Sequence, residues 1–142
     1  QLLDAEGVVD LEHVHVGGGQ PGLLEGGVGG LHRQGGIDAD AGSVEELLYT
    51  EALGFCGPGE AASLVADGTF DIGGRCAVSP SGGLLAMGHP IGPTGVGQVA
   101  EVTRQLRGEA GERQQPGARL GLAHMVGIGA VCVVHVLAGP NP

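Results

Sequence analysis

The sequence predicts an α/β domain built in layers, and three observations support this prediction. Apolar residues recur at helical spacing from Val96 to Leu106. A short apolar run over residues 76–78 precedes this stretch, and two β-branched runs follow it over residues 119–126 and 130–137. A strand, a long helix and two further strands are typical of a layered α/β architecture.

The first 42 residues differ in composition from the rest. They are rich in glycine, and only residues 7–16 carry enough apolar residues to predict a short strand or helix. Glycine loses the most backbone freedom on folding, so the remainder of residues 1–42 is expected to be loop or poorly ordered. The regular pattern that begins at Ser43 predicts a folded domain over residues 43–142.

Two helices are expected at the start of this domain. Ser43 and Glu46 match a capping box, and Gly54 is placed to end the first helix. The second helix is expected to start at Pro58, where a missing N–H does no harm, and to reach Asp67.

The rest of the domain alternates strands with turns. After the strand at residues 76–78 comes a glycine-rich loop over residues 79–95. The long helix then starts near Pro93 or Thr94 and is ended by Gly108. The last two apolar runs are close enough in sequence to form a hairpin.

Charge and composition limit the function. The chain has 142 residues, 31 of them glycine, and a formal net charge of −10. An acidic surface repels phosphate backbones, which argues against a nucleic-acid partner. Aromatic residues make up only 2 %, so the core must consist of aliphatic side chains.

The spacing of the cysteines and the lack of a recognisable signal peptide predict a reducing compartment. The three cysteines form no CxxC pair, and we expect them to be free thiols that act as buried small apolar residues: Cys56, Cys76 and Cys132. No apolar run reaches the ~18–20 residues of a membrane helix, and no signal peptide is evident, so the expected location is cytoplasmic. The chain starts at Gln1, which fits a fragment or a processed chain.

The loop over residues 79–95 holds the candidate chemistry. His89 lies between Gly88 and Pro90, just before the long helix. The N-terminus of that helix favours developing negative charge, and an imidazole beside it can donate to an oxyanion or accept a proton. The alternative is a glycine-rich connector with an incidental histidine.

The same loop resembles a known pattern. Residues 81–95 are similar to the thiolase run of a small polar residue, Gly-Gly, and then Gly-His-Pro-(Leu/Ile)-Gly-x-(Thr/Ser)-Gly. Residues 51–60, 73–75 and 122–129 resemble the sterol-carrier, lipid-transfer branch of the thiolases. The resemblance covers residues 43–138 and implies an incomplete C-terminal half of a thiolase fold, with helices packed on a mixed sheet.

The resemblance also implies roles for individual residues. His89 would activate a nucleophilic cysteine and help to line an oxyanion hole. His124 falls where other thiolases place a second catalytic cysteine, and it would line the site. A purely structural hydrogen bond remains an equal alternative for His124. The glycine-rich turn would shape the substrate-binding floor through Ser81, Gly82, Gly83 and Gly88.

Two departures from the thiolase pattern concern catalysis. Thiolases attack with a cysteine on the N-terminal half, which this sequence lacks. The sterol-carrier branch has His-Asp-Cys-Phe before the first helix, where this chain has Ala-Asp-Ala-Gly at residues 39–42. We therefore expect the isolated chain to be inactive. The alternative to an acyltransferase domain is an inactive fragment or an acyl- or lipid-binding module.

The thiolase resemblance also indicates ligands and partners. The substrate would be an acyl-CoA thioester, used in Claisen condensation or thiolytic cleavage, and no other cofactor is expected. The expected partners are the missing N-terminal half and further copies in a homo-oligomer. His13 and His15 place two imidazoles on one face of a strand, but no third ligand has convincing spacing, so no metal is expected.

Overall fold

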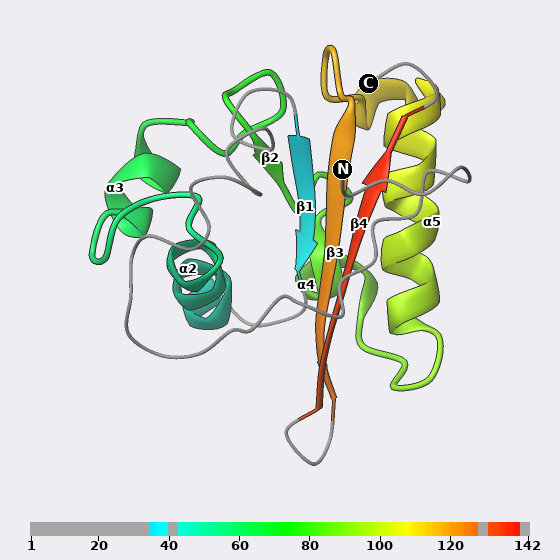
Figure 1. Cartoon of the computed structure of the whole chain (residues 1–142), viewed down its shortest axis with the longest axis horizontal. Helices are drawn as coiled ribbons and strands as arrows, with labels where there is room; N and C mark the ends of the chain where they lie inside the picture. The colour runs from blue at the N-terminus through cyan, green and yellow to red at the C-terminus, as the bar shows by residue number, and fades with distance from the viewer. Residues whose placement is uncertain (1–34, 40–42, 128–130, 140–142) are drawn as a thin grey trace, which may run out of the picture.

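A mixed sheet organises the part of the chain that the computed structural model describes, which comprises residues 35–39, 43–127 and 131–139 (Figure 1). Within these residues the sheet has four strands, in the order β2 (Ala77–Val78), β1 (Gly35–Ala39), β3 (Leu120–Gly127) and β4 (Val131–Ala138). β1 is parallel to both β2 and β3, whereas β3 and β4 are antiparallel. The predicted α/β architecture with a mixed sheet is confirmed.

The strand β1 corrects the expectation for residues 1–42. We expected no regular structure there outside residues 7–16, and this is wrong for Gly35–Ala39. β1 lies inside the sheet and pairs with neighbours on both edges. Pairing on both sides supplies the order that two glycines do not favour by themselves. Residues 7–16 lie outside the described residues.

The two longest helices match the predictions closely. They are α2 (Ser43–Ala52) and α5 (Thr94–Arg107). Gly108 ends α5 in a left-handed conformation, with a φ of 71°, which glycine adopts without steric cost. The side chain of Ser43, half of the expected capping box, lies outside what the structure describes.

The sequence predicted one of the three short helical segments with a different start and did not predict the other two. α3 (Ala61–Ala66) begins three residues after Pro58, because residues 57–60 form a turn in which the Glu60 N–H donates to the Gly57 carbonyl. α4 (Gly83–Met87) and the 3-10 helix η1 (Gly111–Arg113) were not predicted. α4 consists mostly of strong helix formers, but the glycines around it led us to expect a continuous loop.

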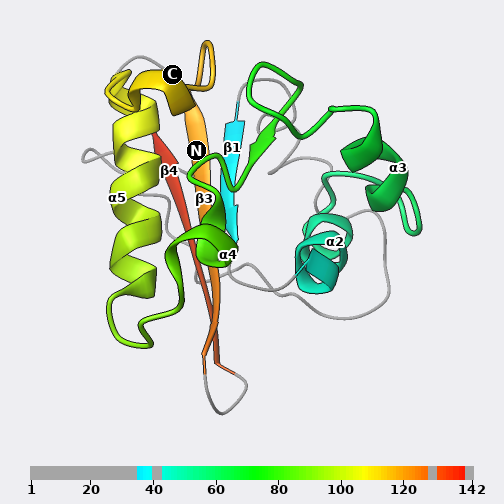
Figure 2. The same ribbon diagram turned by 180° about the vertical axis from the view of Figure 1, so that it is seen from behind.

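Helices lie on both sides of the sheet. Figures 1 and 2 show α5 along one side and α2 and α3 on the other. On the α5 side, Gly121 of β3 lies so close to Val102 that a side chain at residue 121 would collide with it. On the other side, four buried residues form the core cluster: Phe55, Phe70, Cys76 and Leu122. The expectation of a purely aliphatic core is wrong, because both phenylalanines are buried in it. Alternation along β3 therefore directs odd-numbered residues to α5 and even-numbered residues to the core cluster.

The last two strands form the predicted hairpin. The ladder runs from the pair Leu120–Ala138 to the pair Gly127–Val131, one residue further than the expected strand end at Val126. The connection at residues 128–130 lies outside the described residues.

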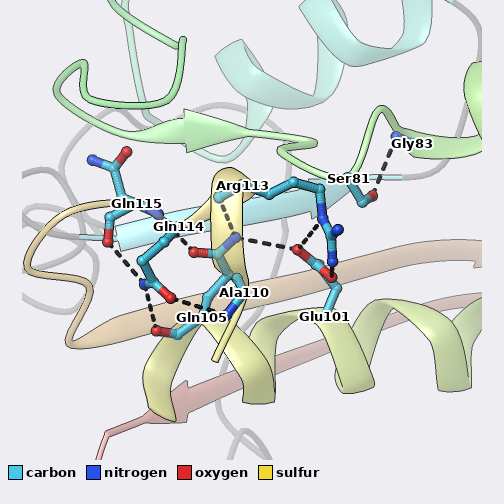
Figure 3. Close-up of polar contacts among 8 residues, drawn as sticks. All are labelled: Ser81, Gly83, Glu101, Gln105, Ala110, Arg113, Gln114 and Gln115. Carbon is cyan, nitrogen blue, oxygen red and sulfur yellow. Dashed lines mark hydrogen bonds and ion pairs between the residues drawn. The ribbon is translucent and has the colours of Figure 1, made fainter. Parts of the chain in front are cut away.

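A polar network fixes the C-terminal part of α5 to the segment after it (Figure 3). The buried Glu101 accepts hydrogen bonds from Arg113 at both carboxylate oxygens, at 3.2 and 2.9 Å. Gln105 donates to Glu101 and to the Arg113 carbonyl, and it accepts from the Gln115 N–H. Because these buried groups are paired, the network does not carry the penalty of unsatisfied polar atoms.

Candidate active site

The imidazole of His89 is exposed in the loop between α4 and α5. The preceding Gly88 has a φ of 78°, which a side chain would disfavour, and Pro90 follows. The Nδ1 atom of His89 lies 2.8 Å from the hydroxyl oxygen of Thr94. The loop therefore returns to the first residue of α5 and holds the ring there.

The second hydrogen bond of Thr94 favours one tautomer of His89. Thr94 is buried, and its hydroxyl donates to the Pro90 carbonyl at 2.9 Å. A hydroxyl has one proton, so when the Thr94 hydroxyl donates to Pro90 it accepts from His89. Nδ1 of a neutral His89 then carries the proton and Nε2 carries the lone pair, which makes Nε2 the basic atom of the ring.

The start of α5 adds a favourable field. The helix has 14 residues, and its N-cap residue Pro93 makes no side-chain capping hydrogen bond. Thr94 donates its own N–H to the Pro90 carbonyl at 3.1 Å. The positive end of the helix dipole lies at this end and favours an anion nearby.

Backbone conformation and close packing account for the glycines in the turn before α4. The Gly83 N–H donates to the Ser81 hydroxyl at 3.3 Å. Gly82 and Gly83 have φ values of 88° and 58°, and a Cβ on Gly82 would lie 2.7 Å from the Cβ of Ala86. The structure thus explains these glycines by backbone shape and close packing, and their substrate-binding role stays a prediction.

His124 lies in the middle of β3 and is buried. Its ring contacts the Tyr49 ring of α2, with centroids 4.6 Å apart. Its Nε2 atom lies 3.3 Å from the sulfur of Cys132 on β4. The side chain of His124 therefore points to the α2 side of the sheet, opposite to α5.

The backbone connects the strand of His124 with the helix that follows His89. The side-chain amide of Gln98 on α5 donates to the His124 carbonyl at 2.9 Å. A Cβ on Gly95 would lie 3.1 Å from the sulfur of Met125, so the first turn of α5 packs closely on β3. The first two turns of α5 thus position His89 relative to the middle of β3.

The cysteines differ in environment, and the expectation that all are buried is met fully only by Cys76 and is wrong for Cys132. All three are free. Burial raises the pKa of Cys76 to about 12. The pKa of the half-buried Cys56 is also raised, first by burial and then by the charges of Glu51 and Glu60. Cys132 is exposed, because within the described residues its strand β4 is the last one on that side of the sheet.

Within the described part of the chain, no group of three or more His, Cys, Asp or Glu side chains is arranged to hold a metal ion. His13 and His15 lie outside it. No described helix is long and apolar enough to span a bilayer.

Comparison with protein families decides the relationship. Residues 38–138 match the family model described as "Thiolase C-terminal domain-like". The chain belongs to this family. The thiolase C-terminal assignment covers β3, β4 and all the described helices, and it begins inside β1.

Similar proteins cover the same part of the chain. It is 53 % identical over 95 residues to sterol carrier protein 2 of Homo sapiens, which covers 67 % of this chain and 17 % of that protein. It is 47 % identical over 100 residues to an acetyl-CoA acetyltransferase of Methanothermobacter thermautotrophicus, which covers 70 % and 26 %. Among solved structures, the Ltp2-ChsH2(DUF35) aldolase superposes with a TM-score of 0.62 at 28 % identity, over 78 % of this chain and 28 % of that one.

The sequence did not predict the contacts that three residues make with the candidate histidines. Thr94 was expected as a motif residue and as a helix start, but its contact with His89 was not predicted. Tyr49 and Cys132 flank His124, but neither belongs to a motif. The hairpin offered a signal for Cys132, because a correct register makes it a diagonal neighbour of His124.

Proposed function

We propose that this chain supplies the histidine of a thiolase-type acyl-CoA acyltransferase. The intact enzyme would form or cleave the carbon–carbon bond of a 3-ketoacyl-CoA thioester. The observation that carries the proposal is the contact between His89 and Thr94, which orients the ring and favours the tautomer with its lone pair on Nε2. An exposed base that is held in one orientation is what activation of a thiol nucleophile requires.

Each candidate residue has a place in this mechanism. His89 takes the proton of an attacking thiol through Nε2, and the resulting imidazolium offers the same N–H to the oxyanion of the thioester. The turn at Ser81–Gly83 and the end of α4 at Gly88 would form the floor, and His124 would line the site. The chain spans 17 % and 26 % of the two relatives named above, so the attacking cysteine is proposed to come from a further N-terminal half.

Relatives support the choice of substrate. Two of them are named acetyl-CoA acetyltransferase and benzoylsuccinyl-CoA thiolase subunit BbsB, the latter from Thauera aromatica and 43 % identical over 91 residues. A CoA thioester is therefore the proposed substrate class. Assembly as a homo-oligomer in the cytoplasm is part of the same proposal.

A second candidate is an acyl- or lipid-binding module without turnover. Four large apolar side chains between residues 85 and 96 are well exposed: Leu85, Met87, Ile91 and Val96. A relative from Caenorhabditis elegans, 42 % identical over 95 residues, is named non-specific lipid-transfer protein-like 2. Apolar surface beside His89 would suit an acyl chain whether or not a reaction follows.

Thiolysis of acetoacetyl-CoA tests the catalytic proposal. We expect the isolated chain to be inert and to gain activity when an N-terminal half, taken from the Methanothermobacter relative, is added. His89→Ala should then lower the rate about 100-fold, which is the usual size of a general-base effect. His135→Ala is the matched control, because His135 is also an exposed histidine but lies on β4.

The outcomes separate the two candidates. Equal rates for His89→Ala and the unchanged chain in an active mixture would remove the catalytic role of His89. If no mixture is active but the chain binds acetyl-CoA in calorimetry, the binding module is the better description.

A further inference from the structure

The pair formed by His124 and Cys132 is not needed for the chemistry proposed for His89. The sulfur of Cys132 lies 3.3 Å from Nε2 of His124. Cys132 is exposed, whereas only 5 % of the surface of His124 is accessible. An exposed thiol thus contacts the imidazole of a buried histidine.

The sheet register produces this contact. β3 and β4 pair His124 with Val134 and Val126 with Cys132. Cys132 is therefore a diagonal neighbour of His124 and shares its face of the sheet. A shift of the register by one residue would turn Cys132 to the opposite face.

Two further contacts hold His124 in position, one at its ring and one at its backbone carbonyl. The Tyr49 ring packs against it at an interplanar angle of 53°. Gln98 holds the His124 carbonyl from the α5 side. A fixed base beside an exposed thiol is the arrangement that activates a cysteine nucleophile.

We propose that Cys132 and His124 form a second reactive site, in which Cys132 accepts an acyl group from a thioester. The thiol proton passes to Nε2 of His124 while the sulfur attacks the thioester carbonyl. The bond between the carbonyl carbon and the original sulfur breaks, and the departing thiolate takes the proton back. The products are an S-acyl Cys132 and a free thiol, with no net redox change.

The choice of a thioester as the acyl donor rests on the proposed function, but the reactivity of the Cys132–His124 pair does not.

The other two cysteines provide internal comparisons for the reactivity of Cys132. Cys76 is buried, with a pKa raised by desolvation to about 12, and Cys56 also has a pKa raised first by burial. Neither should compete with Cys132 for an electrophile, because the thiolate is the nucleophile.

Alkylation of the full chain by iodoacetamide tests the pair without any CoA ligand. Peptide mass spectrometry should find Cys132 modified before Cys56 and Cys76. His124→Gln should slow modification of Cys132 by about 10-fold or more, a modest part of what general bases achieve.

Because His124 is buried and its variant can misfold, a second variant moves the thiol: Cys132→Val with Val131→Cys. Val131 is exposed and faces the other side of the sheet, so its thiol should react about as slowly as that of the His124→Gln chain.

Acetyl-CoA then tests acyl transfer. We expect an acetyl adduct on Cys132 and release of an equal amount of CoA thiol, in both the unchanged chain and His89→Ala. Fast alkylation without an acetyl adduct would overturn the acyl-acceptor assignment, and a moved thiol as reactive as Cys132 would overturn the pair itself. Loss of thiolysis in His89→Ala is measured separately, so failure of one proposal does not affect the other.

Discussion

At the scale of single residues, one hydroxyl orients the ring of His89. The Thr94 hydroxyl oxygen lies 2.8 Å from Nδ1 of His89 and 2.9 Å from the Pro90 carbonyl oxygen. Because Thr94 is also the first residue of α5, folding of the helix and orientation of the ring depend on the same side chain. Thr94 is thus a positioning residue that acts through His89.

Replacing Thr94 by valine should remove the hydrogen bond that orients His89. The variant lacks the hydroxyl, so Nδ1 has no acceptor at residue 94 and the preference for the Nδ1–H tautomer should fall. We expect about a 10-fold loss of thiolysis in the reconstituted enzyme, which is less than the full effect of a general base. Nitrogen chemical shifts of His89 measure the tautomer directly.

Thr94→Ser is the control for this substitution. Serine keeps the hydroxyl and should keep both the tautomer and the rate. A valine variant whose His89 shifts match those of the unchanged chain would show that Thr94 does not set the tautomer.

The sequence predicted these residues only in part. The motif placed His89 before a helix, and the structure confirms that α5 begins at Thr94. The partner of Nδ1 could not be predicted, because it depends on how the loop returns to the helix. Cys132 was misplaced for a related reason: its exposure depends on which strand forms the edge of the sheet, and the apolar pattern of β4 does not show this.

At the scale of elements, the polar network of Figure 3 ties α5 to η1. Burial acts to raise the pKa of Glu101, but hydrogen bonds from Arg113 and Gln105 and the nearby positive charges outweigh it, so the pKa is lowered overall. A lowered folded-state pKa stabilises the protein at every pH above the unfolded value near 4.5. This stabilisation is lost as the pH falls through the lower, folded-state pKa.

Glu101→Gln should therefore flatten the acid limb of stability. Urea unfolding between pH 7 and pH 3 should show a smaller loss for this variant than for the unchanged chain. At neutral pH the variant should be less stable by about 1–3 kcal/mol, since it weakens hydrogen bonds to a charged group. Glu109→Gln, at an exposed residue just after α5, is the control. An acid limb as steep in Glu101→Gln as in the unchanged chain would exclude Glu101 as its source.

The elements themselves were predicted where a single pattern dominates. α5 has continuous helical spacing and a glycine at its end, so both ends agree with the structure. α4 was missed because five helical residues between glycines give too short a signal. The hairpin was predicted, but a residue pattern with apolar side chains on both faces does not specify its register.

At the scale of the whole molecule, the strand β1 joins parts that are distant in sequence. It pairs with β2 at residues 77–78 and with β3 at residues 120–124. Neither the glycine content nor the motif indicates this, since the partners become neighbours only after the chain between them has folded. The expected domain boundary at residue 43 would remove an interior strand of the sheet.

Ile37→Pro tests whether the sheet depends on β1. Proline has no N–H to donate, and its ring is tolerated mainly at sheet edges, whereas β1 is paired on both sides. We expect the variant to unfold at a lower temperature and over a broader range in circular dichroism, because β2 would lose its partner and β3 one of its two. Ile37→Val keeps the N–H and a β-branched side chain and should unfold like the unchanged chain.

A chain of residues 43–142, which lacks β1, should show the same loss of stability as the proline variant. If either one unfolds like the full chain, β1 contributes nothing to the stability of the sheet, and the folded unit begins at α2.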